Sequence, residues 1–224
     1  EIKAPMQMAC VHLFGPKNSG TNLATSLLDA DPSFKVCNSY EFQSGFANGN
    51  TSCVAPPIGH AFKHCPQLMD QKTDASIPTF VMHRHPCSWL DGMKRKPHNV
   101  AGSAWSKQPE DPMCLDDDDA NCYRNAGRLW HAFYNIALDS VDTNRNFISY
   151  EKILGPGGYK YWRGITKGAL SEAEFKRILG PDAAKRHQTK HRNHCKKLSK
   201  RERTMLENNI DASLLRRFDY SLAD

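Results

Sequence analysis

The residues whose types and spacing most clearly indicate a chemical role form a short loop near the start of the chain. It runs from Gly15 to Gly20 as Gly-Pro-Lys-Asn-Ser-Gly and continues into Thr21-Asn22. An apolar run at 8–14 precedes it, and a stretch with helical spacing at 21–30 follows it. Glycines let backbone N–H groups wrap around an anion, and a helix N-terminus adds unpaired donors and partial positive charge. The order strand, loop, helix therefore predicts a phosphate cradle.

Side chains of this loop have distinct expected tasks. Lys17 can reach a bridging or terminal phosphate oxygen, while the hydroxyls of Ser19 and Thr21 can donate to the anion. The full set of expected ligand contacts comprises Pro16, Lys17, Asn18, Ser19, Gly20, Thr21 and Asn22. The alternative is a plain turn before a helix that Thr21 caps.

This loop differs from the one that binds ATP or GTP. There a lysine and a Mg²⁺-binding Ser or Thr follow the second glycine, whereas Thr21-Asn22 follow it here. Enzymes of that class also hold the metal with an aspartate at a strand end. The run at 80–83 ends instead in Arg84, which can grip a phosphate but cannot ligate Mg²⁺. The pattern predicts a phosphorylated ligand bound without metal, and sulfuryl transfer fits that requirement because the transferred group carries less negative charge.

Five segments, in order over nearly the whole chain, resemble the sulfotransferase superfamily, which uses 3′-phosphoadenosine-5′-phosphosulfate (PAPS) and releases the bisphosphate PAP. GPKNSGTN at 15–22 resembles its 5′-phosphosulfate loop, and HRHPCSWLDGM at 83–93 resembles its 3′-phosphate motif. The weaker matches are the base-carrying strand end at 62–66, the Y-E-x-[IL]-L segment at 148–154 and the closing F-x-Y helix at 215–220. The resemblance implies one sulfotransferase-like domain over 1–224, with a helical C-terminal part from about 165.

The resemblance also implies roles for single residues. His64 is expected to take the proton from the acceptor hydroxyl, with Lys63 or His60 as alternatives. Either Lys17 or Asn18 is expected to contact the bridging oxygen, and Arg84 is expected to grip the 3′-phosphate.

Two positions depart from the family pattern. Asn18 stands where most members carry the basic residue, so that Lys17 lies one position upstream. Gly92 stands where the family has a serine, eight residues after the arginine. Two alternatives follow: Ser88 substitutes as a donor to the 3′-phosphate, or the contact is missing and either PAPS is held more loosely or activity is impaired.

The resulting functional prediction is an enzyme that moves a sulfuryl group from PAPS to a hydroxyl or amine of a carbohydrate, peptide or small metabolite. The alternatives are a P-loop nucleotide or small-molecule kinase, and a degenerate sulfotransferase-like binding protein. A nucleic-acid partner is not expected, because the basic segment 185–203 lacks interleaved aromatic residues. No metal is expected either, although His187, His191 and His194 have helical spacing.

The elements that would position these residues alternate between strand and helix. Strands are predicted at 8–14, 58–64, 77–83 and 146–150, and helices at 21–30, 88–96, 123–141 and over much of the remainder. This alternation predicts a three-layer, P-loop-like α/β fold with a central parallel sheet of about four or five strands. Trp89 and Trp130 are expected in the core, and Ser171 with Glu174 is expected to form a capping box. The loops 38–57 and 99–123 are expected to build the acceptor pocket.

Cysteine content and composition bear on location. The chain has 224 residues, a net charge of +6 and no apolar stretch near the roughly 20 residues that cross a bilayer. Eight cysteines and the glycosylation pattern Asn50-Thr51-Ser52 favour the secretory-pathway lumen (Golgi) or secretion, with the cytoplasm as the alternative. Cys114 and Cys122 are expected to be bridged, whereas Cys10 and Cys87 are expected to be free thiols.

Overall fold

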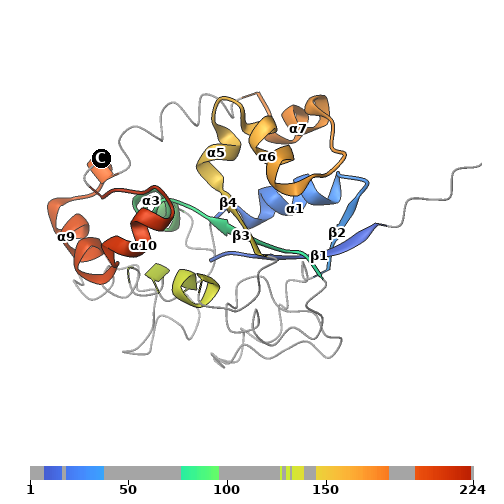
Figure 1. Ribbon diagram of the computed structural model, residues 1–224. Helices are drawn as coiled ribbons and strands as arrows, with labels where there is room; N and C mark the ends of the chain where they lie inside the picture. The colour runs from blue at the N-terminus through green and yellow to red at the C-terminus, as the bar shows by residue number, and fades with distance from the viewer. Residues whose placement is uncertain are drawn as a thin grey trace, which may run out of the picture. The chain divides into compact units, whose positions relative to one another are not determined.

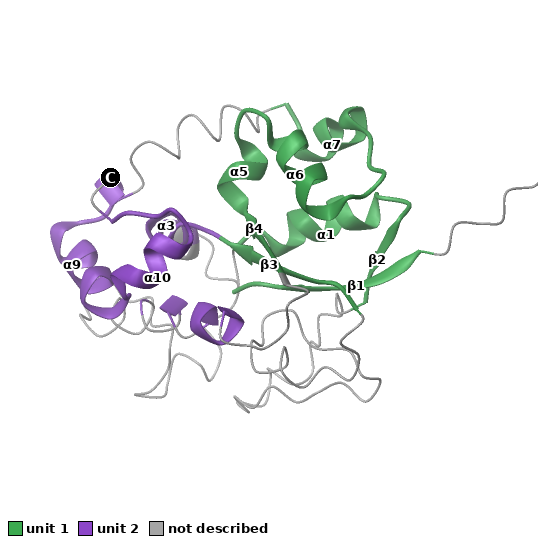
Figure 2. Ribbon diagram, in the orientation of Figure 1, with its two compact units in different colours: residues 1–40, 55–83, 141–189 green, residues 41–54, 84–140, 190–224 purple. Residues whose placement is uncertain are grey.

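The computed structural model describes residues 8–16, 19–37, 77–95, 127, 130–131, 133–138, 145–181 and 195–222. The chain divides into two compact units (Figure 2). The first unit comprises residues 1–40, 55–83 and 141–189, and the second comprises 41–54, 84–140 and 190–224. The predicted organisation as one sulfotransferase-like domain stays a prediction.

A parallel sheet forms the centre of the first unit. Its strands are β1 (Ala9–Phe14), β2 (Phe34–Val36), β3 (Thr79–His83) and β4 (Arg145–Ser149), in the order β2-β1-β3-β4. All three pairings are parallel, with Phe14 opposite Val81 and His83 opposite Ser149. The flanking helices and this sheet confirm the predicted α/β fold class.

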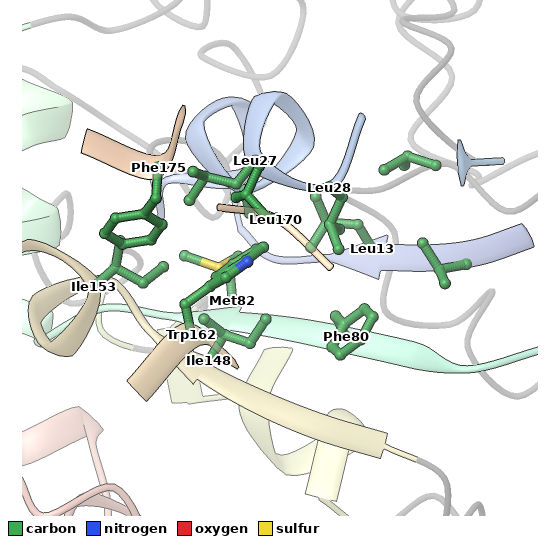
Figure 3. Close-up of a cluster of buried hydrophobic side chains, with 13 residues drawn as sticks. Leu13, Leu27, Leu28, Phe80, Met82, Ile148, Ile153, Trp162, Leu170 and Phe175 are labelled. Carbon is green, nitrogen blue, oxygen red and sulfur yellow. The ribbon is translucent and has the colours of Figure 1, made fainter. Parts of the chain in front are cut away.

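Helices α1 (Thr21–Asp29), α5 (Tyr150–Leu154), α6 (Gly158–Thr166) and α7 (Glu172–Leu179) belong to the same unit. Figure 1 shows α1, α6 and α7 gathered on one face of the sheet. The predicted apolar stripe of α1 is confirmed, since Leu27 and Leu28 are fully buried. The core between sheet and helices (Figure 3) comprises Val11, Leu13, Ala24, Leu27, Leu28, Val36, Phe80, Met82, Ile148, Ile153, Trp162, Leu170 and Phe175.

Side chains on the opposite face of the sheet are buried as well. Side chains alternate along a strand, so Phe14, Val81 and His83 point away from the helices that cover Leu13 and Met82. Phe14 and Val81 are nevertheless fully buried, and His83 is nearly so. A parallel sheet buried on both faces is the arrangement of a three-layer α/β fold.

The second unit is helical where the structure describes it. It contains α3 (Pro86–Arg95), the 3-10 turn η4 (Cys195–Lys197), α9 (Lys200–Asn209) and α10 (Ala212–Arg217). Residues 127, 130–131 and 133–138 are also helical, as predicted for the segment 123–141. The predicted core positions of Trp89 and Trp130 are confirmed, because both side chains are fully buried.

Two disulfides correct the prediction of free thiols. Cys10, on β1, is bonded to Cys37 just after the neighbouring strand β2, with their Cα atoms 5.7 Å apart. Cys87, on α3, is bonded to Cys195 at the start of η4. The expectation failed because partners 27 and 108 residues away in the chain are brought together only by the fold. Cys114, Cys122 and the pattern at Asn50 lie outside the described residues. Within the described ranges, no helix has the length and apolarity to cross a membrane.

Only one of the two hydrogen bonds of the predicted capping box at α7 is observed. Ser171 accepts from the Glu174 N–H as expected. The Glu174 carboxylate, however, does not turn back to close the capping box but pairs with Arg177 at 2.7 and 2.5 Å. A complete capping box occurs instead at α9, between Ser199 and Glu202.

Candidate anion-binding site

The order of strands places the expected ligand-binding site at the carboxyl ends of the strands. From β1 the chain moves outward to β2, and it later returns to pair β3 on the other side of β1. The carboxyl ends of β1 and β3 therefore flank a topological switch point, where ligands bind in open α/β sheets. The predicted phosphate loop leaves the end of β1, and Arg84 directly follows the end of β3 in the chain.

The loop folds back tightly on its own first residue. The Ser19 N–H donates to the Pro16 carbonyl at 3.1 Å and closes a turn. A Cβ atom on Gly15 would lie 2.5 Å from Ser19 Oγ and 3.0 Å from Met82 Cβ. Glycine is required at position 15 because the serine hydroxyl occupies the space that a side chain would fill.

Helix α1 begins at this loop without a side-chain cap. Its N-cap is Gly20, with φ of 100°, and not Thr21 as the alternative interpretation of the sequence had it. No acidic residue lies in the first turn. Helix α6 begins in the same way, at Gly157, whereas α5, α7, α9 and α10 are capped by the side chains of Ser149, Ser171, Ser199 and Asp211. An uncapped helix start presents N–H groups that lack partners within the helix.

Ser19 supplies a second, independent sign of a ligand. Its side chain is fully buried. Among the described residues its Oγ has no hydrogen-bond partner. A buried hydroxyl without a partner costs about 1–3 kcal/mol, and an anion at the start of α1 would remove that cost by accepting its hydrogen.

Tyr150 closes the other side of the loop. A Cβ atom on Gly20 would overlap the Tyr150 ring, and the left-handed φ at this position also favours glycine. Tyr150 is held in place because Ser149 caps α5 through the Lys152 N–H and donates its own N–H to the Tyr161 hydroxyl at 2.8 Å. The sequence had marked Tyr150 only as part of a motif, since nothing in the local pattern shows that its ring meets Gly20.

His83, at the end of β3, carries a neutral imidazole at physiological pH. Burial, assisted by the positive charge of Lys152, lowers its pKa to about 3. For Tyr161 burial shifts the pKa in the other direction: it raises the pKa of the phenol, which likewise favours the neutral form. Neither group is therefore charged in the neutral pH range.

In the second unit, Arg84 is buried and firmly oriented. Only 4% of it is exposed. Its Nε–H donates to Ser88 Oγ at 2.9 Å, and its carbonyl accepts from Trp130 Nε1 at 3.0 Å. Gly92 is buried on α3, one helical turn beyond Ser88. Ser88 thus serves as an acceptor for the arginine, a contact that the sequence did not predict.

One group of described residues has the composition of a metal site. The ligand atoms of His85, Cys87 and Cys195 lie within 4.8 Å of one another. Both sulfurs, however, are joined in the disulfide. The His85 ring accepts from the Cys87 N–H at Nδ1 and lies 2.8 Å from the Ser221 carbonyl at Nε2. In this form the group ties α3 to the C-terminal segment and offers no open ligand position.

Several predicted site residues lie outside the described part of the chain. They are the expected base His64, its alternatives Lys63 and His60, the loop residues Lys17 and Asn18, and the three histidines His187, His191 and His194. The predicted acceptor loops 38–57 and 99–123 lie there too.

No protein-family model matches the chain, and no curated protein sequence matches it.

Proposed function

We propose that the chain is a PAPS-dependent sulfotransferase of the P-loop-like class. The observation that carries the proposal is the buried Ser19 hydroxyl, which has no partner among the described residues and lies beside the uncapped, glycine-started helix α1. Helix N-termini of this kind favour phosphate or sulfate. The 5′-phosphosulfate end of the donor is assigned to this loop, with Lys17 at the bridging oxygen.

The second phosphate of the donor is assigned to Arg84. The guanidinium is buried, charged and oriented by Ser88, which suits recognition of a phosphate by paired N–H groups. A cation at the end of β3, where metal-dependent nucleotide enzymes place a Mg²⁺-binding aspartate, argues for a donor bound without a divalent ion.

In the proposed reaction, the acceptor oxygen or nitrogen attacks the sulfur of PAPS. The new bond to sulfur forms as the bond between sulfur and the 5′-phosphate oxygen breaks, and PAP leaves. His64 takes the acceptor's proton, with Lys63 or His60 as alternatives. The acceptor is proposed to be a glycan, a peptide or a small metabolite with a hydroxyl or amine.

A lumenal or secreted location is part of the proposal. The bonded pairs Cys10–Cys37 and Cys87–Cys195 support it, because such bonds persist in oxidising compartments.

Two assays on the purified chain test the proposal. Thermal shift should show stabilisation by PAP in EDTA that exceeds any stabilisation by ATP with Mg²⁺. Transfer of radiolabel from PAPS to a panel of glycans and peptides should then give labelled product, and His64→Ala should abolish it while PAP still stabilises the protein. Stabilisation by ATP with Mg²⁺ alone would favour a kinase, and PAP binding without any transfer would favour a binding protein.

A further inference from the structure

Arg84 is anchored at both its backbone and its side chain within the second unit. Trp130 Nε1 holds the carbonyl at 3.0 Å, and Ser88 Oγ accepts from Nε at 2.9 Å. All three side chains are buried, with exposures of 4% for Arg84, 1% for Ser88 and 0% for Trp130. The Cys87–Cys195 disulfide fixes the residue next to Ser88. The start of α3 is therefore a rigid frame for the guanidinium.

The bond at Nε has a specific geometric effect. A guanidinium is planar, and its N–H donors form a fixed fork. An acceptor at Nε fixes the rotation of that plane about the side chain, and with it the direction of the two Nη groups. Ser88 is four residues after Arg84 in the first turn of α3, so its position is set by the helix and not by a flexible loop.

Ser88 Oγ has Arg84 as its hydrogen-bond partner among the described residues. Gly92, one turn later and likewise buried, has no side chain that could take over this task. Within this turn of α3, the Ser88 hydroxyl is thus the side-chain group seen to accept from Arg84 Nε.

We propose that Ser88 is a positioning residue that orients Arg84 and thereby gives the site its preference for a nucleotide with a 3′-phosphate. This rests on the proposed function, because it takes Arg84 to be the group that grips that phosphate. Ser88 acts through the arginine, and its own contact with the ligand is not required.

The test is a double-mutant cycle read out as a ratio of affinities. Calorimetry in EDTA gives the dissociation constants of PAP and of AMP, which differ by the 3′-phosphate, for the wild type, Ser88→Ala, Arg84→Ala and the double variant. Ser88→Ala should lower the preference for PAP about tenfold, the size of one hydrogen bond to a charged group, and leave AMP binding unchanged. In the Arg84→Ala background the same substitution should change nothing, since coupled residues are non-additive.

Ser88→Thr is the matched variant, because it keeps the hydroxyl at the same carbon and should retain most of the preference for PAP. It also keeps the test decisive if Ser88→Ala folds poorly. An equal loss from Ser88→Ala with and without Arg84 would overturn the inference and make Ser88 a ligand in its own right. An unchanged preference in Ser88→Ala would overturn the inference while leaving the proposed function intact. A wild type that does not distinguish PAP from AMP would refute the assignment of Arg84, and the inference with it.

Discussion

At the scale of single residues, Gly20 and Gly157 form a natural pair for testing how the phosphate loop is held. Both are N-caps of nine-residue helices with positive φ, 100° and 78°. A Cβ on Gly20 would overlap Tyr150, whereas one on Gly157 would meet nothing within 4 Å.

Gly20→Ala should therefore destabilise the protein clearly more than Gly157→Ala. The second change carries only the backbone strain of about 1 kcal/mol, and the first adds a steric clash of about 1–3 kcal/mol. Urea unfolding of both variants measures the difference. Adding Tyr150→Ala should relieve part of the cost at Gly20 and none at Gly157; equal costs at the two glycines would show that the ring does not constrain the loop.

The buried imidazole of His83 predicts a dependence of stability on pH. The pKa is lowered from 6.5 to about 3 in the folded state, so between these values the unfolded chain binds one more proton than the folded one. Stability should therefore fall as pH falls below 6.5, by about 1.4 kcal/mol per pH unit from this residue, until the folded pKa is reached.

His83→Gln removes this titration and should flatten the dependence. Unfolding free energies measured from pH 7 to pH 5, above the main range of carboxylate titration, give the slopes directly. The variant should lose less stability over this interval than the wild type. Parallel curves for the two proteins would mean that the imidazole takes up its proton in the folded state.

At this scale, what the sequence could predict was the loop, because glycines, a serine and a helix start are adjacent in the chain. The contacts that shape the loop and the Arg84 turn were not predictable. Tyr150 meets Gly20 across 130 positions of sequence, and Trp130 reaches Arg84 across 46. Which way Ser88 directs its oxygen likewise depends on where the arginine side chain lies.

At the scale of elements, Asp31 joins the turn after α1 to the segment before α7. Its buried carboxylate accepts from the backbone N–H groups of Ser33, Ala169 and Leu170 at 2.9, 3.0 and 2.9 Å. This clip fixes the far end of α1, the helix whose N-terminus forms the proposed anion site.

Asp31→Ala should destabilise the protein by about 3 kcal/mol or more, because it leaves three N–H groups without their acceptor. Asp31→Asn is the matched change, since its single amide oxygen can keep the bonds made to one carboxylate oxygen, and it should cost less. Denaturant unfolding of the wild type, Asp31→Asn and Asp31→Ala gives the free energies of unfolding, which should decrease in that order. A cost near zero for Asp31→Ala would show that water or a neighbour replaces the carboxylate.

Most described strands and helices followed from periodicity and turn chemistry. The apolar runs gave β1, β3 and β4 to within two residues of their observed ends, and α1 began at Thr21 as predicted. Strand β2 was missed because its three residues are too few for an alternating pattern. Helix α3 begins at Pro86, two residues before the predicted start, since proline suits the first position of a helix.

At the scale of the whole molecule, the two disulfides cross-link very different lengths of chain. Cys87 and Cys195 are separated by 108 positions, whereas Cys10 and Cys37 are separated by 27. The sequence alone could not predict which cysteines pair, because eight cysteines allow about a hundred connectivities.

Replacing Cys87 and Cys195 by serine should cost more stability than replacing Cys10 and Cys37. In the chain-entropy account, closing the longer loop contributes about 4.8 kcal/mol and closing the shorter one about 3.5 kcal/mol. Urea unfolding of the two double variants under non-reducing conditions makes the comparison. A larger loss for the Cys10–Cys37 variant would show that local packing of β1 against β2 outweighs loop length.

The account as a whole depends on an anion bound at the start of α1 beside Ser19. Titration calorimetry of PAP in EDTA, on the wild type and on Ser19→Ala, tests it most directly, with a thermal melt of both proteins. The account predicts metal-independent binding by the wild type, about tenfold weaker binding by the variant, and no loss of melting temperature, since the hydroxyl has no partner among the described residues. Absence of binding without Mg²⁺, or equal affinity in the two proteins, would contradict it.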